Sequence, residues 1–235
     1  PLWDTLCKAA QPLAGQPMRA GDDLATLIYT SGTTGMPKGV MHNFNNFAWA
    51  LDAGIRRLPM GQDDRMLSYL PLAHVVERVL VEHGWLRTGM HVFFADSLDT
   101  FTSDMQRARP TIFFSVPRLW VKFQQAIQHK MPEPKLQRLL GLPIIGGLVR
   151  RKIQKTLGLD QARICAGGAA PMPLALLQWY SKLGLAINEG YGMTENLAVS
   201  HITVPGKNQQ GSVGPTYEGV QHRIDPETGE IQMKS

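Results

Sequence analysis

Cysteine is nearly absent from this sequence. Its 235 residues include two cysteines, Cys7 and Cys165, which lie far apart and have no metal-ligand spacing around them. Small secreted domains depend on several disulfides, and structural zinc sites need clustered Cys and His ligands. The sequence therefore excludes a disulfide scaffold and a zinc module, and we expect two packing cysteines in a cytoplasmic protein.

Long apolar runs are also missing. No stretch is long enough to cross a bilayer, and no charged segment followed by an apolar one resembles a secretory leader. The chain opens Pro1-Leu2-Trp3-Asp4 without an initiator methionine, so we expect a fragment of a soluble protein. Apolar residues make up 43% of the chain, as in ordinary globular proteins.

Net charge is modest, at +5. The basic residues concentrate in one region, at Lys130, Lys135, Arg138, Arg150, Arg151, Lys152 and Lys155. Aromatic residues do not alternate with these bases, and no helix-turn-helix or zinc pattern accompanies them, so nucleic acid is not indicated as a partner. A solvated helix face is the favoured interpretation; peripheral contact with a membrane and a patch for coenzyme phosphates both stay open.

An alternation of strands and helices begins near residue 65. Apolar runs predict strands at 66–70, 90–94, 111–116, 162–166 and 185–189. Apolar residues at helical spacing predict helices at 75–84, 98–108, 117–127, 148–157 and 173–183. This order indicates an α/β fold, a mostly parallel sheet with helices on both faces, and ligands beyond the carboxyl ends of the strands.

The remaining segments have other characters. We expect a lead-in over 1–21, a strand buried on both faces over 24–29, a helix capped by Asn43, and an irregular Pro- and Gly-rich insert over 131–147. A β-hairpin is predicted within 220–234. Three units follow from this reading: 1–60 as part of an incomplete first sheet, 61–212 as a second α/β subdomain, and 213–235 as the start of a β-rich subdomain.

The stretch from Tyr29 to Gly39 concentrates hydroxyls, glycines and one cation. Its residues are Thr30, Ser31, Gly32, Thr33, Thr34, Gly35, Met36, Pro37 and Lys38. Glycines let a backbone approach a ligand closely, hydroxyls donate to phosphate oxygens, and Lys38 adds a mobile positive charge. A Walker loop is excluded because Pro37 and Gly39 stand where its glycine and hydroxyl belong. The stretch predicts a phosphate-binding loop of another type.

Three further strand ends carry unusual groups. His74 follows the strand at 66–70, although a lone His at a helix start is more often structural. Gly168 and Ala169 follow the strand at 162–166, where small residues let a flat ligand lie against the backbone, or simply make a tight turn.

The fourth strand end reads Tyr191-Gly192-Met193-Thr194-Glu195. Tyr191 can stack on adenine, Thr194 can donate to a phosphate oxygen, and Glu195 can hold Mg²⁺. Each also has an ordinary alternative, as a core aromatic, a turn hydroxyl and a surface acid.

Together these stretches resemble the adenylate-forming enzymes. The loop from Tyr29 to Gly39 and the segment Tyr191 to Glu195 resemble the two signatures of that superfamily, and Leu70-Pro71-Leu72-Ala73-His74 resembles its long-chain fatty acyl-CoA synthetases. The resemblance implies the large domain of an acyl-CoA synthetase or luciferase, here incomplete.

The resemblance also implies residue roles. Those for ATP fall on Thr30, Ser31, Gly32, Thr33, Thr34, Gly35, Lys38, Gly168, Ala169, Tyr191, Gly192 and Thr194; those for the acyl substrate fall on His74 and Gly168. Glu195 would hold Mg²⁺, and Lys38, Thr194 and Glu195 would act in catalysis.

The implied activity is ATP-dependent formation of a fatty acyl-adenylate, followed by transfer of the acyl group to coenzyme A. A fatty acyl-AMP ligase would look nearly the same, and a nucleotide-binding or membrane-docking module without chemistry is an alternative of another class. The family's ribose-binding Asp and its C-terminal catalytic Lys have no counterpart within these residues, so the fragment alone is expected to be inactive.

Overall fold

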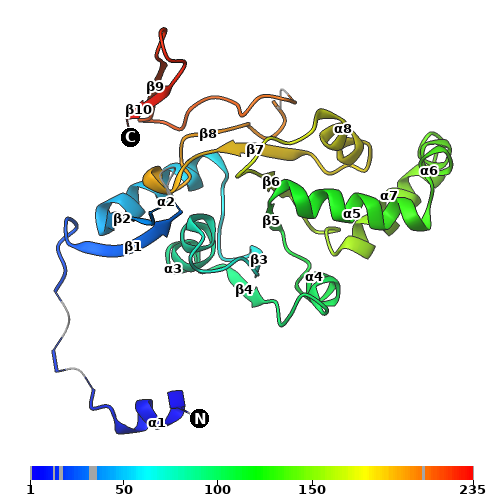
Figure 1. Cartoon of the computed structure of the whole chain (residues 1–235). Helices are drawn as coiled ribbons and strands as arrows, with labels where there is room; N and C mark the ends of the chain where they lie inside the picture. Colours follow the sequence, from blue (N-terminus) through cyan, green and yellow to red (C-terminus); the bar gives the residue numbers. More distant parts are fainter. Residues whose placement is uncertain (1, 13, 16–17, 32–35, 208–209, 235) are drawn as a thin grey trace.

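The computed structural model describes residues 2–12, 14–15, 18–31, 36–207 and 210–234. Its first half contains α1 (Leu2–Ala9), β1 (Leu24–Thr30), β2 (Lys38–Asn43), α2 (Phe44–Arg57), β3 (Arg65–Ser68), the π-helix η1 (Glu77–His83), α3 (Gly84–Thr88), β4 (His91–Phe94) and α4 (Phe101–Ala108). Its second half contains β5 (Ile112–Ser115), α5 (Pro117–Lys130), α6 (Glu133–Leu140), α7 (Ile145–Leu157), β6 (Ile164–Gly167), α8 (Leu174–Lys182), β7 (Ile187–Tyr191), the 3₁₀-helix η2 (Thr194–Asn196), β8 (His201–Ile202), β9 (Gln221–Ile224) and β10 (Ile231–Lys234). Figure 1 shows their arrangement.

The central sheet has the order β5-β6-β7-β8, with β5, β6 and β7 parallel and β8 antiparallel. Side chains alternate between its faces, as strand geometry requires. Phe113 and Cys165 pack into a core cluster with α5, α7 and α8, whereas Ile112 and Ile164 pack into a second cluster with α2 and η1. Helices therefore cover both faces, which confirms the predicted α/β class.

The strands β3 and β4 form a parallel pair beside β5. The junction is polar: the Asp64 carboxylate accepts hydrogen bonds from the Thr111 hydroxyl (2.6 Å) and from Arg163 Nε (2.9 Å). Burial raises the pKa of Asp64, but the hydrogen bonds from Arg163 and Thr111 outweigh it and hold the pKa below its usual value. Asp64 thus joins three chain segments at the amino ends of the strands.

Most of the predicted elements are present. Asn43 caps α2, since its side-chain oxygen accepts a hydrogen bond from the Asn46 amide at 2.8 Å. Pro117 begins α5 as expected, and Trp120 of this helix is fully buried in the core. Burial raises the pKa of the Cys165 thiol to about 12, which agrees with its predicted role in packing.

The expectation that the strand at 24–29 is buried on both faces is wrong. β1 pairs with β2 in an antiparallel ribbon, and only one of its faces packs against the rest of the molecule. Ile28 is buried on that face, whereas Leu27 and Tyr29 on the other face are exposed. A continuous apolar run suggests a strand with both faces buried, but here α2 and η1 cover only one face of the β1–β2 ribbon.

The expected irregular insert at 131–147 is also wrong, since it holds α6 and the start of α7. Pro132 and Pro134 stand at the cap and first turn of α6, where a missing amide costs nothing, and Gly141 ends it. The lead-in contains the exposed helix α1, and the short strand β8 lacked a clear sequence signal. No helix among the described residues is long and apolar enough to cross a membrane.

Candidate active site

The β1–β2 ribbon brings Thr30 and Lys38 opposite one another, because the two residues pair across the strands that flank the predicted phosphate loop. Cross-strand partners share a face, and so do alternate residues along a strand. Thr30 and Lys38 therefore lie on the same face as the buried residues Ile28 and His42. Gly32, Thr33, Thr34 and Gly35 lie outside the described residues, and Ser31 immediately follows β1.

His42 connects this ribbon to the segment that begins at Tyr191. Its imidazole is 2% exposed, and Nε2 lies 2.8 Å from the carbonyl oxygen of Thr194. A carbonyl oxygen only accepts, so Nε2 carries the proton. The contact spans 152 positions of sequence and fixes the Thr194 turn against the strand that carries Lys38.

The turn after β7 is tightly folded. Thr194 to Asn196 form a single 3₁₀ turn, and the Asn196 side chain accepts a hydrogen bond from the Met193 amide at 2.8 Å. Leu197 and Ala198 follow with positive φ values of 53° and 61°. Such conformations are costly for residues other than glycine, and they gather at functional sites.

Gly192 is required by this geometry. A Cβ added there would lie 2.5 Å from the Ala198 backbone. The glycine of the second signature therefore allows the chain to double back on itself. The turn presents Thr194 toward the molecule and leaves Glu195 exposed.

The turn after β6 lies beside the end of β7. A Cβ on Gly168 would approach the carbonyl oxygen of Gly190 to 2.8 Å. Ala169 adopts φ 67° and is exposed, so the turn also stores strain. The backbone at Gly168 therefore packs closely against the end of β7, and a larger residue would not fit there.

His74 lies where β3 leads into η1. Its Nδ1 accepts a hydrogen bond from the Val76 amide at 3.2 Å, which leaves Nε2 to carry the proton of the neutral ring. Burial lowers the pKa of His74, so the ring is neutral near pH 7. It therefore offers one N–H donor.

Glu77 and Arg78, which follow, make structural contacts. Glu77 accepts a hydrogen bond from the Ser68 hydroxyl at 2.5 Å. Arg78 donates to the Thr26 hydroxyl at 2.9 Å, so η1 is tied to both β3 and β1.

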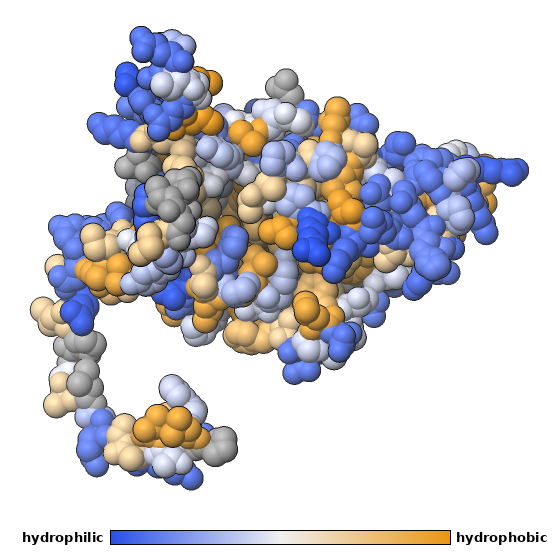
Figure 2. Space-filling model, in the orientation of Figure 1, coloured by the Kyte–Doolittle hydropathy of each residue, from blue (hydrophilic) through white to orange (hydrophobic). Residues whose placement is uncertain are grey.

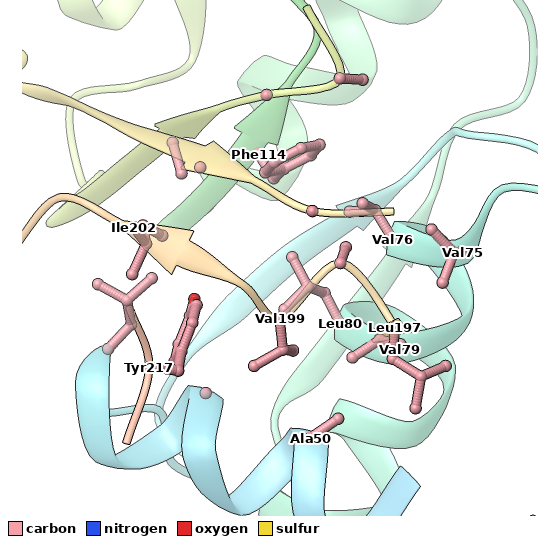
Figure 3. Close-up of a pocket in the computed structure, with 18 of the residues that line it drawn as sticks. Ala50, Val75, Val76, Val79, Leu80, Phe114, Leu197, Val199, Ile202 and Tyr217 are labelled. Carbon is pink, nitrogen blue, oxygen red and sulfur yellow. The ribbon is translucent and has the colours of Figure 1, made fainter. Parts of the chain in front are cut away.

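A cavity of about 290 Å³ lies between α2, η1 and the strand ends. Figure 3 shows aliphatic side chains facing one another across it, among them Val79, Leu80, Val199 and Ile202, with Phe114 above and Tyr217 at one side. Five predicted site residues line it: His74, Gly168, Ala169, Gly192 and Thr194. The structure thus brings together residues from three separate motifs.

Tyr191 and Glu195 stay outside the cavity lining. The Tyr191 ring is half-buried and lies 5.9 Å from the His201 ring, and Glu195 is exposed. Mg²⁺ binds proteins through one or two carboxylates, with water and substrate phosphates completing its shell, so a single exposed Glu195 fits that ion. No cluster of three or more potential metal-ligating side chains occurs in the described part of the chain.

Sequence reasoning missed His42 and the α2 wall of the cavity. The apolar residues of α2 that line the cavity have the same spacing as core residues, so no local signal separates them. His42 follows the phosphate loop closely, but its partner is visible only in three dimensions.

The α/β fold and the two signature stretches together resemble the large domain of the adenylate-forming enzymes. Residues 3–234 match the profile of the AMP-binding enzyme family, and the chain belongs to this family.

Two curated relatives are long-chain-fatty-acid–CoA ligases: ACSBG2 of Xenopus laevis, 31% identical across 85% of this chain, and ligase 5 of Rattus norvegicus, 34% identical across 82%. Each alignment covers 31% of the relative, so the chain spans about a third of their length.

Solved structures show the same fold. The anthranilate CoA ligase AuaEII, in complex with anthranoyl-AMP, matches 99% of this chain with a TM-score of 0.76 at 21% identity, over 43% of its own chain. ATP-bound MatB from Rhodopseudomonas palustris matches 97% with a TM-score of 0.71 at 28% identity, over 41% of its chain. The predicted large-domain architecture is confirmed.

Proposed function

We propose that the protein containing this chain activates a long-chain fatty acid with ATP and transfers the acyl group to coenzyme A. In the first step a carboxylate oxygen bonds to the α-phosphorus of ATP, and pyrophosphate leaves. In the second step the coenzyme A thiolate bonds to the acyl carbon, and AMP leaves.

The cavity is the observation that carries this proposal. It is lined mainly by aliphatic side chains, and the side chains with polar atoms in its lining are His74, Thr194, His201 and Tyr217. An apolar pocket with a few polar groups suits a ligand with a hydrocarbon body and one reactive head. The cavity volume is at the small end of the range for ligand pockets. The cavity would therefore hold the part of the acyl chain nearest the carboxylate of the fatty acid.

The residues of the site have distinct tasks. Thr30 and Lys38 lie on the inner face of the ribbon and would hold the phosphates, with the loop between them. The neutral His74 would donate its Nε2 proton to the acyl carboxylate, which orients the attacking oxygen. Thr194 would bind the α-phosphate, and Tyr191 would stack on adenine.

Glu195 would hold Mg²⁺, which when bound offsets negative charge on the phosphates. The backbone turn that presents Glu195 is itself fixed by His42 through the Thr194 carbonyl. Positioning and electrostatic stabilisation therefore account for the proposed catalysis, with little covalent work for the protein.

The relatives support the proposal. The names of the two curated relatives give long-chain fatty acids as substrates and coenzyme A as the acceptor, and the MatB structure contains ATP. The same segments of our chain would bind these ligands.

Pyrophosphate exchange by the full-length protein tests the proposal. The assay uses fatty acids of graded length, with and without coenzyme A. We expect exchange that requires a long acid, and thioester formation when coenzyme A is added. Exchange without any thioester would indicate an acyl-AMP ligase, and absence of exchange with every acid would refute adenylation.

A further inference from the structure

The positive charge of the chain gathers on one helical hairpin. Between Glu133 and Leu157 there are six basic residues and a single acidic one, Glu133. The basic residues are Lys135, Arg138, Arg150, Arg151, Lys152 and Lys155. This segment alone carries a net charge equal to that of the whole chain, +5. In Figure 1 the hairpin of α6 and α7 forms the right-hand end of the molecule, and Figure 2 shows that end covered mainly by hydrophilic residues.

The connection between the two helices has the opposite character. It is aliphatic and protrudes: Ile144 is 85% exposed and Leu148 is 65% exposed, with Leu142 and Ile145 also exposed. Ile144 adopts φ 66°, an unusual conformation for a β-branched residue, and this turns the chain into α7. Four large aliphatic side chains therefore stand in solvent at the tip of a basic hairpin.

The exposed side of α7 changes from apolar to positively charged along the length of the helix. Ile145, Leu148, Lys152 and Lys155 recur at spacings of three and four, so they form one stripe. The opposite stripe, with Gly146, Ile153 and Leu157, is buried against the core. The outward stripe is thus apolar at its start and cationic at its end.

We propose that this hairpin docks the protein onto an anionic lipid bilayer, with the 142–148 tip inserted among the acyl chains and the basic residues at the headgroups. Along a helix, Lys152 lies about 6 Å beyond Leu148, and Lys155 about 10 Å. The headgroup region of one leaflet is about 5–8 Å thick. The lysines would therefore meet lipid phosphates when Leu148 reaches the hydrocarbon edge.

Other occupants fit the surface less well. A second copy of the chain would bring two strongly basic hairpins together, and like charges repel. Nucleic acid would match the charge, but residues 133–157 contain no aromatic side chain for base stacking. An anionic bilayer satisfies both the charge and the aliphatic tip, and the cytoplasmic leaflet supplies such a surface.

Co-sedimentation of the full-length protein with vesicles tests the docking. The vesicles contain phosphatidylcholine alone or a mixture with phosphatidylglycerol. One double variant is Ile144→Ser with Leu148→Ser, and its matched control is Ile224→Ser with Ile231→Ser, which alters two exposed aliphatics of the β9–β10 hairpin. The second double variant is Lys152→Gln with Lys155→Gln. Its matched control is Lys207→Gln with Lys234→Gln, which removes two exposed lysines elsewhere in the chain.

We expect the tip variant to lose about 100-fold or more in binding to both kinds of vesicle, since each of the two inserted aliphatic residues contributes about tenfold or more. The lysine variant should lose about 25-fold on the anionic vesicles only, because each cation near such a surface contributes about fivefold. The control variants should bind like the wild type, and all should keep its circular dichroism and its pyrophosphate exchange with a detergent-dispersed acid.

Three results would overturn the proposal. The first is vesicle binding by the tip variant equal to that of the wild type. The second is equal binding of the wild type to neutral and anionic vesicles. The third is protection of the Ile144 and Leu148 side chains from hydroxyl-radical oxidation in the free full-length protein, because another part of the protein would then cover the tip.

Discussion

Removing the His42 imidazole should impair adenylation more than folding. In His42→Ala the Thr194 carbonyl loses its partner at 2.8 Å, and a buried group left without its hydrogen bond costs about 1–3 kcal/mol. The Thr194 turn would then shift relative to Lys38. A displacement of about 1 Å at a positioning group reduces turnover about 10²-fold, so we expect a loss of kcat of that order.

The assay is pyrophosphate exchange by the full-length protein at saturating acid and ATP, with kcat and KM determined separately. A conservative variant, His42→Gln, keeps an N–H donor at similar reach and should recover much of kcat. The matched control is His83→Ala, since His83 stacks on Phe47 at 3.9 Å and also packs in this region, but bonds to the Arg78 carbonyl instead.

The control separates positioning from stability. His83→Ala should lower the melting temperature about as much as His42→Ala while leaving kcat within a few-fold of the wild type. Equal losses of kcat in the two variants, or no recovery with glutamine, would refute the role assigned to His42.

Three further predictions concern the cavity, the core and the phosphate loop. Gly54 lines the cavity from α2, with open space where a Cβ would stand. Gly54→Leu should therefore shift the preferred fatty acid toward shorter chains, whereas the control Ala48→Leu, on the exposed face of α2, should not. Acids of graded length in the exchange assay test this. Asp64→Asn should lower the free energy of unfolding by about 2 kcal/mol at pH 7, because charged hydrogen bonds to Arg163 are lost. Since the folded pKa of Asp64 lies below the unfolded one, its contribution is present above about pH 4 and disappears as the pH falls through the folded value; a urea titration series in which the two proteins differ equally at pH 3 and pH 7 would contradict this. Lys38→Ala should weaken binding of ATP more than binding of a non-hydrolysable acyl-adenylate analogue, which lacks the β- and γ-phosphates, and equal weakening in calorimetry would show that the lysine only supports the loop.

The sequence predicted the α/β class because buried strands and amphipathic helices have local patterns. Val116-Pro117 and Asn43 mark helix starts through short-range sterics and hydrogen bonds, and both predictions are confirmed. The error at 24–29 came from a property that is not local. Whether Tyr29 is covered depends on what lies against the β1–β2 ribbon, and the sequence of the strand does not contain that information.

The residues of the candidate site also divide into those that local sequence patterns indicated and those that only the three-dimensional structure reveals. Gly168, Gly192 and Thr194 were found because backbone turns near ligands demand particular residue types at fixed spacing, and the structure places all three around one cavity. His42 and Gly54 were missed, since their positions beside the site depend on neighbours far along the chain. The binding and catalytic roles of all the site residues, and the division into three units, stay predictions.

The central claim is that this chain carries the adenylation site of a fatty acid ligase, and Glu195 tests it most directly. Pyrophosphate exchange is measured for the full-length protein and for Glu195→Gln across a range of Mg²⁺ concentrations. The substitution removes the charge but keeps the shape, so the fold and melting temperature should stay unchanged. We predict a loss of ~10²-fold or more in exchange rate, the scale for removing one preorganised electrostatic group. Exchange at the wild-type rate at saturating Mg²⁺ would contradict the assignment.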